Sequence, residues 1–440
     1  HFSIGQNEGG NLPWKFVGKR EMELLEKIGF TRIAGSPEEE KAAQILKEEC
    51  DKLGVPAIIQ PFEIEQGIVE EATLEILEPF QQEIPVTGYQ CAQNTPEEGL
   101  EAPFLYVENA DDVSLSDARG KIVLVNGYMR VPLFRKLMKA GVAGIVTMEG
   151  QLRDKREETD LSTRKLRRTL RAFGNVPMVH TRVLDAIDMV RKGACKARLV
   201  LKGRTEEWTS HNVIATVLGT EKPEEIVSFG AHYDSVDFSK GVYDNGAGSV
   251  INMEVLRYFA ENPPKRTLKF VWYGSEEIGL EGSWAYVKAH KEELEAHKLM
   301  INVDVGGPVL GVDRITATAE KELASYLEYF VKIHGFTAEV KQGIYSSDSI
   351  PFADSGVPGV NFSRDGAPRC GLHPRPVRHP LLPFGGYAGE DHPHCAGVRQ
   401  RDGERRPGAR GAEDSPEHRG GCGENTCTRK ELSEAAERNK

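Results

Sequence analysis

The stretch that decides the fold is VWYGSEEIGLEGS, residues 271–283, and its unusual feature is the adjacent acids Glu276 and Glu277. Apolar and small residues lead into the pair, and glycines follow at positions 279 and 282. Adjacent side chains on a strand point to opposite faces, and neighbouring carboxylates repel each other unless a positive charge or a shared proton offsets the repulsion. The stretch therefore predicts a buried strand that ends in a pair of acids with a positive partner.

Further short apolar runs, rich in β-branched and aromatic residues, predict other buried central strands. They are VSFGAH (227–232), LMINVDV (299–305) and GVPGVNF (356–362). Residues 249–264 carry helical spacing that ends at Asn262 and two prolines, and two more helices are expected within residues 15–53. Ser36 is suited to cap the second of these, with Pro37 at its first position. The pattern predicts an α/β fold with a mixed central sheet covered by helices on both faces.

Composition narrows the class of protein. The chain has 440 residues, 39% of them hydrophobic, and a formal net charge of -11, which disfavours a nucleic-acid binder because phosphate neutralisation needs clustered Lys and Arg. No apolar run reaches the roughly 18 to 20 residues of a transmembrane helix, and the first residues lack the pattern of a signal peptide. Seven cysteines form neither a disulfide framework nor a Cys-x-x-Cys zinc pattern, so Cys50, Cys91 and Cys195 are expected to be buried thiols.

Changes in the predicted elements and in amino-acid composition divide the chain into four parts. Residues 96–205 alternate short strands and helices and predict a small inserted α/β domain between residues 1–95 and 206–373. The composition changes again after Pro368: the basic residues there are 11 Arg and 2 Lys, against 19 Arg and 24 Lys before it. With few apolar residues and no periodic run, residues 374–440 are predicted to be a disordered or out-of-frame tail.

Three of the predicted central strands end in residues able to bind a metal. His232 comes at the end of VSFGAH with Asp234 just after it, the acidic pair follows VWYG, and Asp304 comes at the end of LMINVDV. Asp244 lies in a glycine-rich turn that enters a helix. Functional groups collect at the carboxyl ends of strands in open α/β sheets, so these residues are expected to meet in one crevice. An imidazole and several carboxylates suit zinc, and a shared carboxylate can bridge two ions.

Each of these motifs also has a simpler interpretation. A lone His-x-Asp or Glu-Glu pair is more often a surface or capping feature, and Asp244 before Asn245 and Gly246 also fits ordinary turn chemistry. Asp304 is harder to dismiss, because an unpaired buried carboxylate is costly. Four such sites, each at a strand end or a glycine-rich turn, make coincidence a poor explanation.

In their order, the motifs GAHYDS, DNGAGS, GSEEIGLEGS and INVDVGG resemble the di-zinc aminopeptidase family, whose relatives include the transferrin receptor, glutamate carboxypeptidase II and glutaminyl cyclases. The resemblance covers residues 15 to about 373, and residues 100–204 are similar to a protease-associated domain. It implies two zinc ions, one held by His232 and Asp304 and the other by Glu277 and a late histidine, with Asp244 bridging both. Relatives with such an insert are often exported, which favours a secreted or extracytoplasmic location.

The resemblance also implies roles for residues around the ions. Glu276 is expected to act as general base and acid, and Asp234 to orient His232 from behind. Tyr345 is a candidate for hydrogen-bonding the oxyanion, although it fits a packing aromatic equally well. Many relatives have Asp-His where this chain has Asp348 and Ser349, so substrate contacts at that position differ.

The last ligand of the family is a histidine in a pattern like His-Thr-x-x-Asp. This chain offers CGLHPRPVRHP, in which His373 stands at a plausible distance but Pro374 replaces the threonine. His373 is predicted to be the fifth ligand and the last residue in frame. The expected function is a zinc aminopeptidase acting on peptide substrates. A carboxypeptidase, a glutaminyl cyclase, a receptor-like protein without activity and an inactivated homologue are the alternatives.

Overall fold

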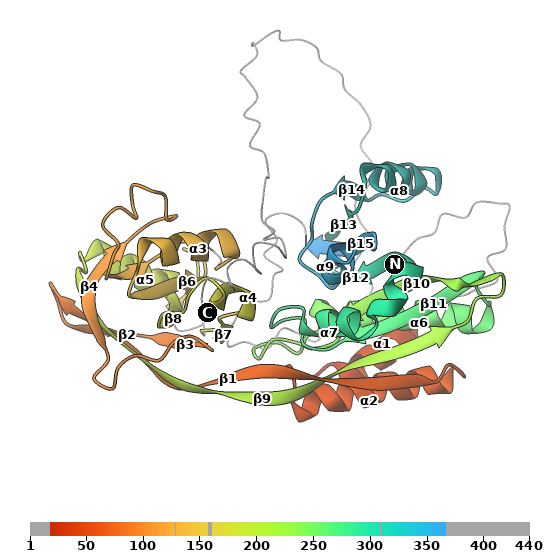
Figure 1. Ribbon diagram of the computed structural model, residues 1–440, viewed down its shortest axis with the longest axis horizontal. Coiled ribbons are helices and arrows are strands. Elements are labelled where there is room, and N and C mark those ends of the chain that lie inside the picture. Colours follow the sequence, from red (N-terminus) through yellow and green to blue (C-terminus); the bar gives the residue numbers. More distant parts are fainter. Residues whose placement is uncertain (1–17, 128, 157–160, 309, 367–440) are drawn as a thin grey trace, which may run out of the picture.

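The computed structural model describes residues 18–127, 129–156, 161–308 and 310–366, which form a larger and a smaller α/β unit (Figure 1). Two 22-residue strands, β1 (Ala57–Glu78) and β9 (Lys196–Val217), pair in antiparallel fashion and run from one unit into the other. By sequence alone, IIQPFEI (58–64) and ATLEIL (72–77) are separate strand-like runs, whereas both belong to the single strand β1 in the structure. His373 and the predicted tail, residues 374–440, lie outside the described residues.

The larger unit carries the predicted central strands. Its other elements are α1 (Gly18–Ile28), α2 (Pro37–Lys52), β10 (Lys222–His232), η2 (Val242–Gly246), α6 (Ala247–Glu261), β11 (Arg266–Tyr273), α7 (Glu281–Ala289), η3 (Lys291–Ala296), β12 (His297–Val303), β13 (Gly311–Thr318), α8 (Lys321–Ile333), β14 (Glu339–Gln342), α9 (Ser349–Asp354) and β15 (Gly359–Gly366). Among the helices of the described residues, none is both long enough and apolar enough to cross a membrane.

The strand order in the larger unit is β14-β13-β15-β12-β10-β11-β9. The middle strands β15, β12, β10 and β11 run parallel, whereas β9 is antiparallel to β11 and β13 is antiparallel to β15. The predicted mixed sheet is therefore confirmed. Because β12, β10 and β11 are parallel neighbours, their carboxyl ends meet at one edge of the sheet.

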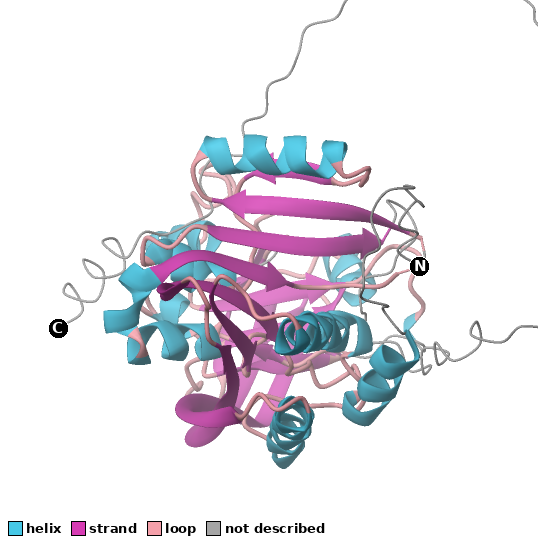
Figure 2. Cartoon of the chain, turned by 90° about the vertical axis from the view of Figure 1, so that its right-hand side faces the viewer, coloured by secondary structure: helices cyan, strands magenta, loops and turns pink. Residues whose placement is uncertain are grey.

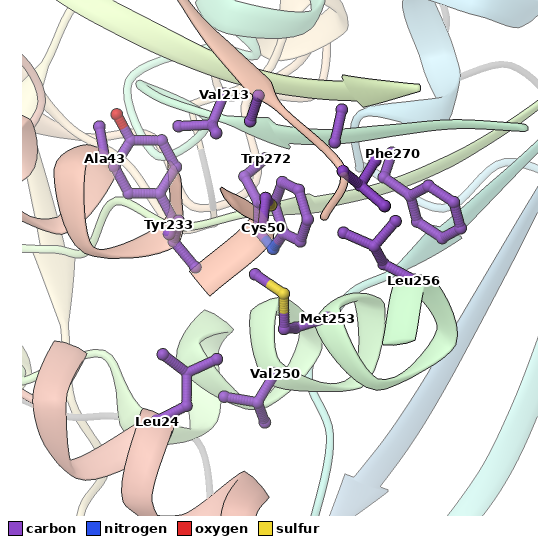
Figure 3. Packing of buried hydrophobic residues seen from close by; sticks show 14 of the residues in the cluster. Leu24, Ala43, Cys50, Val213, Tyr233, Val250, Met253, Leu256, Phe270 and Trp272 are labelled. Carbon is purple, nitrogen blue, oxygen red and sulfur yellow. The ribbon is translucent and has the colours of Figure 1, made fainter. Parts of the chain in front are cut away.

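Helices cover both faces of this sheet (Figure 2). The side chains of β11 point alternately to one face and the other, and each set packs against different helices. Phe270 and Trp272 belong to a core cluster with residues of α1, α2 and α6, such as Met253 (Figure 3). Val271 and Tyr273 instead pack with residues of α7 and α9. Successive side chains on a strand point to opposite faces, so an unbroken apolar run is what a strand buried on both sides requires.

The predicted helix signals are present where the sequence placed them. Ser36 caps α2 by accepting a hydrogen bond from the Glu39 amide at 3.1 Å, and Pro37 is its first residue. Helix α6 ends at Glu261, directly before Asn262. Local signals sufficed here because caps and prolines act within one turn of the chain.

The smaller unit lies at the far end of the β1–β9 ribbon (Figure 1). Its elements are β2 (Gln82–Ile84), β3 (Val86–Gln90), β4 (Leu100–Tyr106), β5 (Ile122–Leu124), α3 (Val131–Ala140), β6 (Gly144–Glu149), β7 (Arg164–Lys165), α4 (Arg168–Arg171), β8 (Met178–Arg182) and α5 (Val183–Arg191). Strand β3 pairs with β8, so the sheet of this unit takes in residues before position 96. The division at residues 96 and 205, and the interpretation as a protease-associated domain, stay predictions.

The cysteines were predicted only in part. Cys50 is buried between α2 and the sheet, as expected, and Cys91 is half-buried. The prediction for Cys195 is wrong, because its side chain is exposed in the turn that leads into β9. A single cysteine without periodic apolar neighbours carries no local signal of its depth.

Candidate metal centre

His232 is the centre of the site. It is the last residue of β10 and is 1% exposed. Its Nε2 lies 3.2 Å from Oδ1 of Asp244 and 3.3 Å from Oδ1 of Asp304, and these three side chains offer ligand atoms that all lie within 4.8 Å of one another. Oε2 of Glu276 is 3.9 Å from the same nitrogen. Parallel strand ends therefore bring an imidazole and three carboxylates together, as the sequence predicted.

Asp244 lies in the π-helical turn η2, just before α6. The turn needs glycine at position 241: its φ is +55°, and a Cβ there would lie 2.5 Å from the Cβ of Ser235. Asn245 fixes the other side, since its Oδ1 accepts from the amide of Val305 at 3.2 Å and its amide nitrogen donates to the carbonyl of Val303 at 2.9 Å. Asn245 thus ties the Asp244 turn to the chain on both sides of Asp304.

The acidic pair begins three residues after β11 ends. The backbone turns sharply there, with φ of +60° at Ser275. Gly282, at the start of α7, packs against the turn so closely that a Cβ would lie 2.2 Å from the carbonyl oxygen of Gly274. The glycines of VWYGSEEIGLEGS therefore let the chain fold back on itself, which presents Glu276 and Glu277 at the strand end.

Asp234 holds this turn in place. It is fully buried, and its Oδ1 and Oδ2 accept hydrogen bonds from the amides of Glu276 and Glu277 at 3.0 and 3.2 Å. Its Oδ1 also lies 3.3 Å from Nδ1 of His232, on the side of the ring away from the acids. The sequence predicted contact with His232, but the hydrogen bonds to the acidic pair depend on the way the turn folds back.

Burial and crowding of like charges dominate the electrostatics. Burial raises the pKa values of Glu276 and Glu277 well above the usual range, and neighbouring carboxylates, including that of Asp304, raise them further. Burial alone would lower the pKa of His232, but the carboxylates of Glu276, Asp234 and Asp244 raise it well above its ordinary value. A cation would offset the repulsion among these crowded carboxylates, and an imidazole with several carboxylates is a donor set that fits a metal ion of the zinc type.

Tyr345 lies in the loop before α9 and is partly buried. Burial raises the pKa of its phenol, and the carboxylates of Asp304, Asp365, Asp244 and Glu276 raise it further, so the side chain is within electrostatic reach of the cluster. Its role as the oxyanion donor stays a prediction.

Asp348 is the acid that the sequence placed beside Ser349. It is fully buried, and burial raises its pKa to about 7, while the charge of His232 lowers it. A buried carboxyl this close to the cluster adds a further negative group to the region around the metal ligands.

Two buried charged residues near the site were not predicted from the sequence. Arg32 and Glu39, from the segment between α1 and the start of α2, are both 0% exposed. Glu39 accepts a hydrogen bond from Ser210 at 2.8 Å and one from Ser275 at 3.5 Å, directly beside the acidic pair. Apolar neighbours of Arg32 in the sequence hint at burial, but no local pattern connects this segment to the strand ends.

The fold and the cluster define an α/β protein of the zinc aminopeptidase type. In comparisons with known proteins, residues 212–375 match the model of peptidase family M28. Aminopeptidase YwaD of Bacillus subtilis is 30% identical over 359 residues, which cover 77% of this chain and 73% of that protein. The chain belongs to peptidase family M28. His373 lies inside the matched range, which ends two residues later.

Two other relatives define the breadth of this similarity. Human carboxypeptidase Q is 28% identical over 298 residues, covering 64% of this chain and 63% of that protein, so the chain spans somewhat less than two thirds of this relative. The solved structure of a zinc aminopeptidase from Bacillus subtilis superposes with a TM-score of 0.64 at 25% identity, covering 82% of this chain and 89% of the other.

Proposed function

We propose that the protein is a metal-dependent exopeptidase, specifically an aminopeptidase that hydrolyses N-terminal peptide bonds with two zinc ions. The observation that carries the proposal is the position of His232 Nε2, which has Asp244 and Asp304 oxygens at 3.2 and 3.3 Å and a Glu276 oxygen at 3.9 Å. A structural ion pair would need one carboxylate for one imidazole. Three carboxylates at one buried histidine instead suit a site for cations.

The ligand assignment follows the family pattern. His232 and Asp304 would hold one ion, Glu277 and His373 the other, and Asp244 would be shared. When bound, the ions would supply Lewis acidity for both the attacking water and the scissile carbonyl. Glu277 would then bind metal, while Glu276, whose Oε2 lies 3.9 Å from Nε2 of His232, would be left for proton transfer.

Glu276 is proposed to move the proton. Its carboxylate is at the cluster without being one of the expected ligands, and burial raises its pKa, which is the direction that favours general base and acid catalysis by a carboxyl group. It would take a proton from the attacking water and return it to the leaving amine. Asp234 would position Glu276 through its hydrogen bond to that residue's amide. Tyr345 would donate its phenolic hydrogen to the developing oxyanion.

A carboxypeptidase is the second candidate, because relatives named carboxypeptidase Q match more than half of the chain. Aminopeptidase and carboxypeptidase activity can be distinguished by the substrates that are hydrolysed. An aminopeptidase hydrolyses leucine p-nitroanilide but not its N-acetylated form, whereas a carboxypeptidase hydrolyses an N-blocked dipeptide with a free carboxylate. A glutaminyl cyclase converts an N-terminal glutamine without cleaving a peptide bond, and a receptor-like homologue leaves all these substrates intact.

The decisive experiment combines zinc content with turnover. We expect the purified protein to contain zinc, to hydrolyse the free-amine substrate and to lose activity with a chelator. Glu276→Gln should lower kcat by about 100-fold or more while zinc content is kept, since loss of a general base costs about that much. Glu281→Gln, five residues on at the start of α7 and half-buried, is the matched control. A Glu276→Gln protein with full activity would contradict the assignment.

His373 needs a separate test. We expect His373→Ala to lose one equivalent of zinc, and His379→Ala, six residues on in the same segment, to keep both. Equal zinc content in the two variants would remove His373 from the ligand set.

A further inference from the structure

We propose that Arg32 is a positioning residue for the metal centre, holding the His232 strand end and the Asp244 turn at their working separation. The inference rests on the proposed function insofar as those two residues bind zinc. Arg32 lies between α1 and α2, far from both residues in sequence, and is fully buried. Its side chain nevertheless reaches both segments.

The guanidinium group is surrounded by backbone carbonyl oxygens. Nε donates to the carbonyl of Tyr233 at 2.5 Å, which is the residue between His232 and Asp234. Nη1 donates to Lys240 at 2.8 Å and Nη2 to Gly241 at 3.0 Å, within the loop that leads to Asp244. One rigid, planar group thus joins the strand end to the ligand turn.

The same group is anchored to its own segment. Nη1 also donates to the carbonyls of Ile28 and Phe30, at the end of α1 and in the loop that follows. The main chain of Arg32 completes the connection, because its amide donates to Oγ of Ser235 and its carbonyl accepts from the Ser235 amide, both at 2.9 Å. Arg32 therefore fixes the segment between His232 and Asp244 to the end of α1.

The carbonyl of Gly241 links the Arg32 side chain to the turn around Asp244. It accepts from Arg32 and also from the amide of Gly246 at 2.8 Å, and the latter bond closes the turn around Asp244. Glycine at position 241 leaves room for the guanidinium, since a Cβ there would lie 2.7 Å from Nη2 of Arg32. The arginine and the glycine fit together at the base of the turn.

Only arginine meets these requirements. Its planar fork carries five N–H donors on three nitrogens, and carbonyls from three segments accept from all three nitrogens here, whereas the ammonium of lysine has three donors at one point. The charge also matters: burial lowers the pKa of Arg32 to about 10 while Asp234 and Asp244 oppose the fall, so the group stays cationic at neutral pH.

The test compares Arg32→Met, Arg32→Lys and wild-type protein for zinc affinity, measured by competition with a chromogenic chelator on metal-free protein. Loss of residues that support metal ligands typically costs 10–100-fold in affinity, so we expect about that loss for Arg32→Met and a smaller loss for Arg32→Lys. Hydrogen exchange of residues 236–245 should accelerate in the same order. In assays at saturating zinc, kcat should fall more than KM rises.

Arg20→Met is the matched control. Arg20 lies on α1 and pairs with Glu254 of α6 at 3.2 Å, so its loss removes an arginine that links two helices of the same unit. We expect lower thermal stability with wild-type zinc affinity and wild-type exchange in residues 236–245. If Arg20→Met weakens zinc as much as Arg32→Met does, the effect is one of general stability and the proposal is overturned.

Two further outcomes decide the matter. Wild-type zinc affinity and wild-type loop exchange in a folded Arg32→Met protein would overturn the proposal, and if that variant does not fold, the same result for Arg32→Lys would do so. A wild-type protein that binds no zinc would instead overturn the proposed function. Hydrogen exchange of residues 236–245 would then still test whether Arg32 holds the Asp244 turn.

Discussion

Replacing Glu39 by glutamine should make the protein more stable at alkaline pH, although a charged residue is lost. Glu39 is fully buried, and its carboxyl accepts hydrogen bonds from Ser210 at 2.8 Å and from the amide of Gly35 at 2.8 Å. Burial raises its pKa to about 8, and the charge of Asp234 adds to the rise. A glutamine resembles the protonated carboxyl in shape: its amide oxygen can accept from the Gly35 amide, and its amide nitrogen can donate to the Ser210 hydroxyl, which both donates and accepts.

The sign and size follow from proton linkage. The folded state keeps the proton of Glu39 between about pH 4.5 and pH 8, where the unfolded state has lost it, so folding takes up a proton and stability falls as pH rises through this window. Each pKa unit is worth about 1.4 kcal/mol, so a shift of about 3.5 units gives an upper limit of about 5 kcal/mol. Glutamine does not titrate, so the stability of Glu39→Gln relative to wild type should rise by several kcal/mol across the window.

The assay is urea unfolding of both proteins with chelator present at pH 5, 7 and 9, followed by tryptophan fluorescence. The other buried acids are common to both proteins, so the difference between them isolates Glu39. Glu38→Gln, at the exposed neighbouring position, should change stability by less than about 0.5 kcal/mol at every pH. A stability difference between Glu39→Gln and wild type that stays constant from pH 5 to pH 9 would refute the reasoning.

Three other predictions follow from the site and the core. Zinc affinity should rise with pH, because the raised pKa of His232 means that protons must leave before the metal binds; calorimetry in two buffers of different ionisation enthalpy should detect their release, and a pH-independent affinity would contradict this. Asn245→Ala should weaken zinc by about 10-fold, since it cuts the link between the Asp244 turn and the Asp304 strand end; chelator competition measures this, and an unchanged affinity would rule it out. Trp272→Ala should cost about 3–5 kcal/mol of unfolding free energy in urea titrations, and a cost below about 1 kcal/mol would mean that the core is not packed as described.

Much of the fold was predictable because its signals are local. Short apolar runs gave β10, β11, β12 and β15, and the Ser36–Pro37 cap and the Asn262 stop gave the ends of two helices. The length of β1 was not predictable, because the polar residues in its middle predict a loop between two strands. They form part of one strand only because they pair with β9. Exposure of Cys195 likewise depends on a turn that no periodic pattern marks.

The sequence by itself determined which chemical groups stand at the strand ends. His232, Glu276 and Asp304 were predicted to lie together because they end or follow buried strands whose ends meet, and Asp244 because it lies in a glycine-rich turn that enters a helix. The glycines of VWYGSEEIGLEGS marked the turn that carries the acidic pair.

Only the tertiary structure decided what supports those groups. Arg32 meets the Tyr233 carbonyl across 201 positions of sequence, and Glu39 meets Ser210 across 171. Asp234 reaches the amides of the acidic pair 42 and 43 positions away. Such contacts depend on the fold as a whole, because a buried charge is tolerated only where distant segments supply its hydrogen-bond partners, and no local pattern encodes that.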